Sequence, residues 1–207
     1  MGRYVIVDLE MCRVNKKQKK ETGYKYGSEL IQIGAVELDE EYKVSREFST
    51  YVKPKYGEID GFIERLTGIT NKDTSKAPSA EDAIRSFVEW LPEGAVPVSW
   101  SDSDKNQIKH ETECKNIEIE GLDEYVESWL DCQRMFSEKL NSPKTYNLTE
   151  ALNISGVMYT EGIHNALVDA YNTALLFAKM QTEPKLKLSA YYVTEDDTDS
   201  EWRSAFD

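Results

Sequence analysis

Cysteine and histidine are scarce in this sequence, which has three cysteines and two histidines among 207 residues. The cysteines include no C-x-x-C pair and are odd in number, which argues against a disulfide framework and against a structural zinc site. We therefore expect reduced thiols at Cys12, Cys114 and Cys132.

Long apolar runs are missing as well. No stretch approaches the roughly 20 apolar residues that a membrane-spanning helix needs. The N-terminus also lacks the basic-then-apolar layout of a signal peptide. These features predict a cytoplasmic protein of one domain with a tail, and no membrane partner.

Basic residues are outnumbered, and the formal net charge of −13 argues against a protein that coats nucleic acid over its whole surface. Residues 111–131 hold eight acids and one basic residue, Lys115. Residues 13–28 instead hold one acid, Glu21, among six basic side chains: Arg13, Lys16, Lys17, Lys19, Lys20 and Lys25. An acidic chain with one basic segment predicts a focused anion site.

Hydrophobic periodicity predicts alternating strands and helices. We expect strands over residues 4–10, 29–38, 44–52, 95–100 and 127–130. We expect helices over residues 59–66, 79–91, 101–114, 131–140, 147–152 and 166–181. Pro97 implies that the fourth strand lies at an edge of the sheet or begins there. The order of elements favours an α/β fold in which helices flank a central mixed sheet of five strands.

The first strand ends in two carboxylates, Asp8 and Glu10. Because side chains alternate along a strand, both point to the same side. Like charges held side by side raise each other's pKa, which is costly unless a cation or a reaction uses them. The alternative interpretation is a strand that runs out into a polar turn.

Two further acids can join this pair. Asp104 follows the fourth strand, and Asp169 lies in the last helix behind His164. Four carboxylates at one point need neutralisation, and oxygen ligands favour two divalent cations, Mg²⁺ or Mn²⁺. Such ions promote in-line displacement at phosphorus, for which His164 is a natural general base. The alternative role for one of Asp102 and Asp104 is helix capping.

The basic segment leaves directly from the end of the first strand and sets two tyrosines among its lysines. Single-stranded nucleic acid is bound by this combination of cations and aromatic faces. We expect a loop over residues 13–28 whose substrate-binding side chains are Lys16, Lys17, Lys19, Lys20, Tyr24 and Tyr26. The alternative is a solvated, mobile loop without a binding role.

Five motifs also occur in a fixed order: Val-Asp-Leu-Glu, Glu-Leu-Ile-Gln-Ile-Gly-Ala-Val, Leu-Thr-Gly-Ile-Thr, Trp-Ser-Asp-Ser-Asp and His-Asn-Ala-Leu-Val-Asp-Ala-Tyr-Asn-Thr-Ala. Together they resemble the DEDDh 3′–5′ exonucleases of the RNase T/DnaQ superfamily, in particular the branch of the histone-mRNA exonuclease and the KapD-like bacterial proteins. The resemblance covers about residues 3–182. We therefore expect a 3′–5′ exonuclease domain at residues 1–182 and an acidic C-terminal extension at residues 183–207.

This resemblance implies an RNase H-like fold and hydrolysis from a free 3′ end, with release of nucleoside 5′-monophosphates. It implies His164 as the general base and four metal ligands: Asp8, Glu10, Asp104 and Asp169. Asp104 is preferred to Asp102 because the family's acid precedes the apolar residues of the helix, here Ile108.

The resemblance also bears on substrate contacts. Leu9 and Met11 flank the carboxylates where the family contacts the terminal nucleotide, and many relatives have a small hydroxyl residue at the Met11 position. The remaining histidine, His110, is interpreted as an exposed helix residue.

The expected partner is single-stranded nucleic acid, RNA rather than DNA. A proofreading-type exonuclease that acts on DNA uses the same chemistry and is one alternative. A degenerate domain that binds nucleic acid without cleaving it is another, although all five chemical residues are present. Dimers occur in relatives, so a homodimer is one expected assembly.

Overall fold

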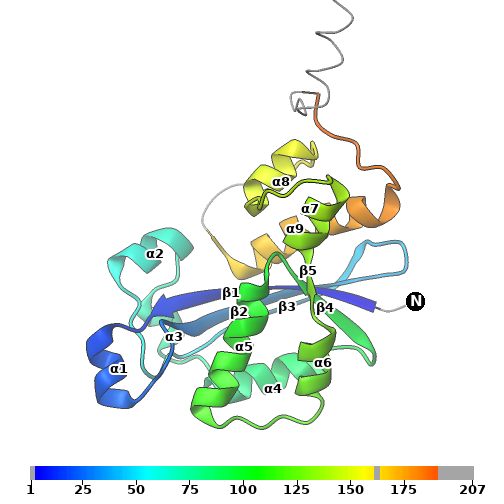
Figure 1. Ribbon diagram of the computed structural model, residues 1–207. Coiled ribbons are helices and arrows are strands. Elements are labelled where there is room, and N and C mark those ends of the chain that lie inside the picture. Colours follow the sequence, from blue (N-terminus) through cyan, green and yellow to red (C-terminus); the bar gives the residue numbers. More distant parts are fainter. Residues whose placement is uncertain (1–2, 161–163, 191–207) are drawn as a thin grey trace, which may run out of the picture.

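The computed structural model of the protein describes residues 3–160 and 164–190 (Figure 1). A five-stranded sheet lies at its centre, in the strand order β3-β2-β1-β4-β5. β1 pairs antiparallel with β2 and parallel with β4, so the sheet is mixed, as the sequence predicts. The strands are β1 (Arg3–Arg13), β2 (Ser28–Leu38), β3 (Val44–Tyr51), β4 (Ala95–Ser99) and β5 (Leu130–Asp131).

Helices cover both faces of the sheet, which confirms the predicted architecture (Figure 1). One layer contains α4 (Ala80–Trp90), α5 (Asp102–Lys115) and α6 (Leu122–Ser128). The other layer contains α7 (Cys132–Lys139), α8 (Leu148–Ile154) and α9 (Ala166–Thr182). The short helices near the end of β1 are α1 (Lys16–Thr22), α2 (Gly61–Thr67) and α3 (Asn71–Thr74). Within the described part of the chain, no helix is long and apolar enough to span a bilayer.

β1 divides its side chains between the two helix layers. Val5 and Val7 are buried in the apolar cluster that includes α4, whereas Ile6 belongs to the cluster that includes α9. Because side chains alternate along a strand, Asp8 and Glu10 share the side of Ile6 and face the α9 layer. The register with β2 shifts immediately after Glu10, so regular pairing is interrupted at the carboxylates.

The predicted fifth strand is wrong in its position. Residues 127 and 128 belong to the last turn of α6, and β5 consists of two residues, Leu130 and Asp131. Leu122 and Val126 are buried and lie four positions apart, the spacing of a helix face rather than of a strand.

The position of Pro97 is also different from the expectation. β4 lies between β1 and β5 and is therefore not an edge strand. β5 pairs with Val98 and Ser99 alone, so the side of β4 that faces β5 has no partner strand at Pro97. The proline is tolerated because the ladder on that side begins after it.

Residues 13–28 contain a helix and are not the predicted loop. The Asn15 side chain accepts hydrogen bonds from the N–H groups of Lys17 and Gln18, and the Asn15 N–H donates to the Gln18 side chain. Gly23 ends α1 in the left-handed conformation, at φ 77°. This capping box satisfies the N–H groups that open a helix, and it outweighs the lysine-rich composition.

A buried ion network fastens α5 to the start of β2. Lys115 Nζ lies 2.6 Å from Glu29 Oε1 and 2.5 Å from Glu111 Oε2, and both glutamates are fully buried. Glu29 also accepts hydrogen bonds from three N–H groups of residues 55–57, and Glu111 accepts one from Leu30. Because each buried carboxylate has both a cation and N–H donors, the network holds α5 against the sheet.

The first turn of α9 lies directly on β2 at Gly34. A Cβ atom added to Gly34 would be 2.2 Å from backbone atoms of Ala166 and Leu167. The Gln32 side chain, two positions earlier on β2, accepts a hydrogen bond of 3.2 Å from the Ala166 N–H. Gly34 pairs with Asp8 across the sheet, so this close approach sets α9 beside the carboxylates of β1.

The chain continues to pack against the domain after α9. Leu186 is buried in the cluster that includes α9, and the Ser189 N–H donates to the Ile154 carbonyl at 2.7 Å. Residues 191–207, which hold most of the acids of the predicted extension, lie outside the described residues. The boundary at residue 182 stays a prediction.

Replacing Gly34 by alanine is expected to displace the first turn of α9, because the new methyl group would overlap the Ala166 backbone. We expect the free energy of unfolding to fall by about 1–3 kcal/mol in chemical denaturation. Gly27→Ala is the matched control, since only the flexible end of Lys19 lies within reach of its Cβ, at 3.8 Å. It should change stability by about 0.5 kcal/mol or less, and equal losses for both variants would contradict the packing argument.

Candidate metal and catalytic site

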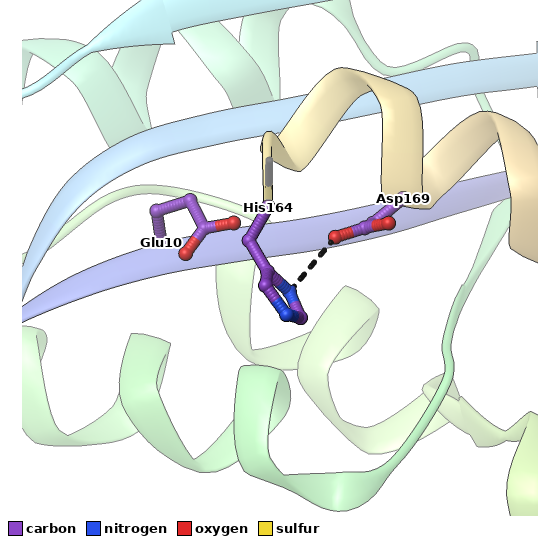
Figure 2. A group of neighbouring side chains, drawn as sticks. All are labelled: Glu10, His164 and Asp169. Carbon is purple, nitrogen blue, oxygen red and sulfur yellow. Dashed lines mark ion pairs between the residues drawn. The ribbon is translucent and has the colours of Figure 1, made fainter. Parts of the chain in front are cut away.

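Three predicted site residues meet where α9 begins over β1. Donor atoms of Glu10, His164 and Asp169 all lie within 4.8 Å of one another. Figure 2 shows Glu10 on β1 below the start of α9, which brings His164 and Asp169 to the same side of the sheet. The structure therefore brings together residues from the first strand and the last helix.

Asp104 completes the site from α5. Its Oδ1 atom accepts a hydrogen bond of 3.0 Å from the Leu9 N–H, and the side chain is buried. Asp102, the other candidate, lies 2.6 Å from Lys105 Nζ and remains partly exposed. Ser101 caps the helix through its hydroxyl group, so capping does not require Asp104. This geometry supports the choice of Asp104 over Asp102.

Burial raises the pKa of every carboxylate in the cluster, and repulsion by neighbouring carboxylates adds to the rise at Asp8 and Glu10. Burial is the main reason that the pKa of Asp8 lies well above its usual value, and the charges of the neighbouring carboxylates add to it. Burial and then the charges of Asp169 and Asp104 raise the pKa of Glu10 to about 8. Burial raises the pKa of Asp104 to about 7, although a hydrogen bond from a backbone N–H opposes the rise. Burial also raises the pKa of Asp169.

These raised pKa values are what a divalent-cation site is expected to have before the ion binds. Carboxylates that repel one another in a partly buried space gain most when a cation neutralises them. The donor set consists of oxygen atoms with one imidazole, which suits Mg²⁺ or Mn²⁺ better than a thiolate-binding metal. The residues present thus fit the metal ions that the sequence predicts.

His164 is accessible to solvent and is held at both its backbone and its ring. Its side chain is 61% exposed, and its Nδ1 atom lies 3.3 Å from Asp169 Oδ2 (Figure 2). Its N–H donates to the Leu66 carbonyl of α2 at 3.0 Å. A solvent-exposed imidazole beside a cluster of acids can exchange protons with bulk water, as a general base must.

The side chains predicted to contact substrate differ in how accessible they are. The Leu9 side chain is buried in the core on the opposite side of β1, so it offers no surface to a nucleotide. Met11 is half-buried and packs against the same apolar cluster as Leu9. Lys16, Lys17 and Lys20 are exposed on α1, whereas Lys19 is half-buried and directs its Nζ atom to the Lys25 carbonyl at 3.4 Å.

The expectation that Tyr24 stacks on substrate is wrong. Tyr24 is 3% exposed, and its hydroxyl donates to the Ser28 carbonyl at 2.8 Å, so the ring belongs to the interior. Tyr26 is half-buried and stacks on His110, with ring centres 3.5 Å apart. His110, which the sequence suggests is an exposed helix residue, lies on α5 but is half-buried.

Sequence reasoning missed other residues that shape the site. Gln32 and Gly34 seat α9, and the signal was present as a polar residue and a glycine inside an otherwise apolar strand. Phe62 on α2 is 47% exposed, and the Arg13 guanidinium lies 4.3 Å from its ring centre. No signal in the sequence pairs these two residues, because they come from separate elements.

Comparisons with known proteins show the family to which this chain is similar. A sequence profile of the RNase T family, described as an exonuclease, matches residues 5–177. ERI1 exoribonuclease 2 of Danio rerio is 30% identical over 202 residues, which cover 86% of this chain and 35% of that protein. The chain therefore spans about a third of the length of this relative.

Two further likenesses concern a polymerase subunit and a solved structure. The DNA polymerase III subunit epsilon of Aquifex aeolicus is 28% identical over 182 residues, which cover 88% of this chain and 82% of the subunit. A structure described as 3′-end specific recognition of histone mRNA stem-loop by 3′-exonuclease has a TM-score of 0.71 at 16% identity. It covers 93% of this chain and 72% of that chain, and this likeness of fold confirms the expected RNase H-like architecture.

Glu10→Gln is expected to stabilise the metal-free protein at high pH. The folded-state pKa of Glu10 is about 8 and the ordinary value is 4.5, so the unfolded state binds fewer protons between these values. Stability therefore falls as the pH rises through this window, and glutamine removes the cost. At pH 8.5 with a chelator present, the free energy of unfolding of the variant should be about 1–3 kcal/mol higher than that of the wild type.

The control for this prediction is the same comparison of stability at a lower pH. At pH 5 the difference should largely vanish, because Glu10 is then protonated in the folded protein and partly protonated in the unfolded chain. Added Mg²⁺ should stabilise the wild type more than the variant. A variant that is less stable than the wild type at pH 8.5 would show that Glu10 is not held under repulsion.

Proposed function

The chain belongs to the RNase T family of exonucleases, and we propose that it removes nucleotides from the 3′ end of single-stranded nucleic acid, RNA in preference to DNA. The products are nucleoside 5′-monophosphates. The observation that carries this proposal is the convergence of Glu10, Asp169 and His164 within 4.8 Å of one another. Asp8 and Asp104 belong to the same cluster, because the charges of Asp104 and Asp169 raise the pKa values of both Asp8 and Glu10.

Two divalent ions, Mg²⁺ or Mn²⁺, are proposed to be held by the carboxylates of Asp8, Glu10, Asp104 and Asp169. When bound, they supply neutralisation of these carboxylates and stabilisation of the charge that develops on the phosphate and on the leaving oxygen. Asp104 keeps its position through the Leu9 N–H, so its carboxylate is oriented before any ion binds. Preorganised oxygen ligands avoid the cost of reorganisation during the reaction.

His164 is proposed to take the proton from the attacking water. Its ring is 61% exposed and contacts Asp169 through Nδ1 at 3.3 Å, which limits rotation of the imidazole. Asp169 therefore both faces the cluster and orients the base. After attack, His164 can release the proton to solvent, and the bond from phosphorus to the 3′ oxygen of the preceding nucleotide breaks.

The substrate strand is proposed to pass over α2 toward α1. The Leu66 carbonyl of α2 accepts the His164 N–H, so this helix lies beside the base. Phe62 on the same helix presents an exposed ring next to the Arg13 guanidinium, a pairing that suits base stacking with a phosphate contact. Lys16, Lys17 and Lys20 extend the positive surface from there.

RNA is the preferred substrate in this proposal because the Danio rerio relative is named an exoribonuclease. DNA is the second candidate, because the Aquifex aeolicus relative is a subunit of a DNA polymerase. Both share the chemistry of the cluster, so the difference lies in contacts to the 2′-hydroxyl group.

A nuclease assay separates these candidates from a non-catalytic binding domain. The wild type should shorten single-stranded RNA from the 3′ end in the presence of Mg²⁺, faster than single-stranded DNA of the same sequence. Asp8→Asn should reduce kcat by about 100-fold or more, because one ligand of the cluster loses its charge. If wild type and Asp8→Asn are equally inert on both substrates, the enzymatic proposal fails; a preference for DNA would instead favour the polymerase-like alternative.

Removing the charge of α1 tests the proposed path of the substrate. The triple variant Lys16→Gln, Lys17→Gln and Lys20→Gln should raise KM about 5- to 10-fold at low salt and weaken its dependence on salt, with little change in kcat. The control carries the same charge change on other exposed lysines: Lys43→Gln, Lys185→Gln and Lys187→Gln. An equal rise in KM for both triple variants would mean that overall charge, and not α1, guides the substrate.

A further inference from the structure

Asn172 makes an unusual connection between α9 and the chain that precedes it. It lies one turn after Asp169 and is 3% exposed. Its Nδ2 atom donates to the Thr160 carbonyl at 3.0 Å, and its Oδ1 atom accepts from the Thr160 N–H at 3.1 Å. The side chain thus pairs with both polar backbone groups of one residue, as a neighbouring strand would.

This pairing lies close to the proposed base. His164 follows Thr160 by four positions, and Asn165 then caps α9 by accepting from the N–H groups of Leu167 and Val168. The hydrogen bond from His164 N–H to Leu66 holds the chain from the side of α2. Asn172 holds it from the side of α9, upstream of His164. Thr160 and His164 are therefore each held by a different element, Thr160 by α9 and His164 by α2.

Asn172 also reaches the carboxylate that faces His164. Hydrogen bonds from the side chains of His164 and Asn172 lower the pKa of Asp169, against the larger effect of burial. One buried amide thereby contacts the backbone before His164 and the carboxylate that orients its ring. A buried amide whose hydrogen bonds are unmet is costly, so this geometry is strongly favoured.

We propose that Asn172 is a positioning residue for the exonuclease reaction. Its two hydrogen bonds to the Thr160 backbone help to fix the position of His164 relative to Asp169. This inference rests on the proposed role of His164 as the general base. It assigns to Asn172 no contact with substrate. Its effect on the reaction passes through His164 and Asp169.

The test begins with Asn172→Ala, assayed on single-stranded RNA with saturating Mg²⁺. We expect kcat to fall about 10- to 100-fold, because a small displacement of the base costs about this much. KM for the RNA should stay within about 3-fold of the wild type, since α1 and α2 are untouched. A rise in KM with unchanged kcat would overturn the proposal.

Asn147→Ala is the matched control for a loss of stability alone. Asn147 caps α8 by a side-chain hydrogen bond to the Glu150 N–H, so its loss also removes an asparagine-to-backbone contact. The loss of this cap should lower the Tm of the variant. Its kcat should stay within about 2-fold of the wild type. If kcat falls as far in Asn147→Ala as in Asn172→Ala, the effect is one of general stability and the proposal is wrong.

A double-mutant cycle with His164→Ala shows whether Asn172 acts through the base. In the His164→Ala background, adding Asn172→Ala should reduce the residual kcat by no more than about 3-fold, because the group to be positioned is gone. Equal fold losses in both backgrounds would refute a role through His164. If His164→Ala alone retains the full kcat, the proposed function of His164 fails instead, so the two failures are distinguishable.

Asn172→Asp is the second variant, for the case that the alanine variant does not fold. The aspartate has the same shape and keeps an acceptor for the Thr160 N–H, but it loses the donor to the Thr160 carbonyl. We expect it to reduce kcat at least 10-fold while KM for the RNA is kept. A wild-type kcat in this variant would show that the hydrogen bond from Asn172 to the Thr160 carbonyl is dispensable, and would overturn the proposal.

Discussion

Repulsion between carboxylates is the constraint on which the rest of this structure depends. Asp8, Glu10, Asp104 and Asp169 lie in a partly buried cluster, and the pKa values of all four are raised. Such an arrangement does not hold itself together, because every pair of ionised members favours separation. The surrounding fold must therefore hold the carboxylates in place, and the sheet, α5 and α9 each hold at least one of them.

The protein contains a second buried group of acids, and the two groups show opposite solutions. Glu29 and Glu111 share an internal cation, because Lys115 lies between them, and backbone N–H groups donate to both carboxylates. Among the described residues, the carboxylates of the site have His164 as their basic partner and form no ion pair with a lysine or arginine. The first group ties α5 to the sheet. The second stays electrostatically unsatisfied, which is the property that gives it affinity for cations.

Features of this protein that depend on residues close together in the sequence could be predicted, whereas contacts between distant residues could not. Strand alternation is local, so the common face of Asp8 and Glu10 could be predicted from the sequence. Helix register favoured Asp104 over Asp102 as a ligand, and this choice stays a prediction. The helix in residues 13–28 was also locally encoded, by Asn15 and Gln18, but its lysine-rich composition drew attention to charge instead. The burial of Tyr24 and the contact of Gly34 with α9 depend on elements far apart in the sequence, and no local pattern reports them.

The order of the elements along the chain has a consequence for synthesis. β1 and α5, which carry three of the carboxylates, are synthesised before His164 and Asp169. Gln32 and Gly34 of β2, which contact the first turn of α9, are also synthesised before that helix. A growing chain therefore carries a sheet with an unfinished centre and no base. The proposed site is therefore complete only after α9 has packed onto β2, because His164 and Asp169 follow the other site residues in the sequence.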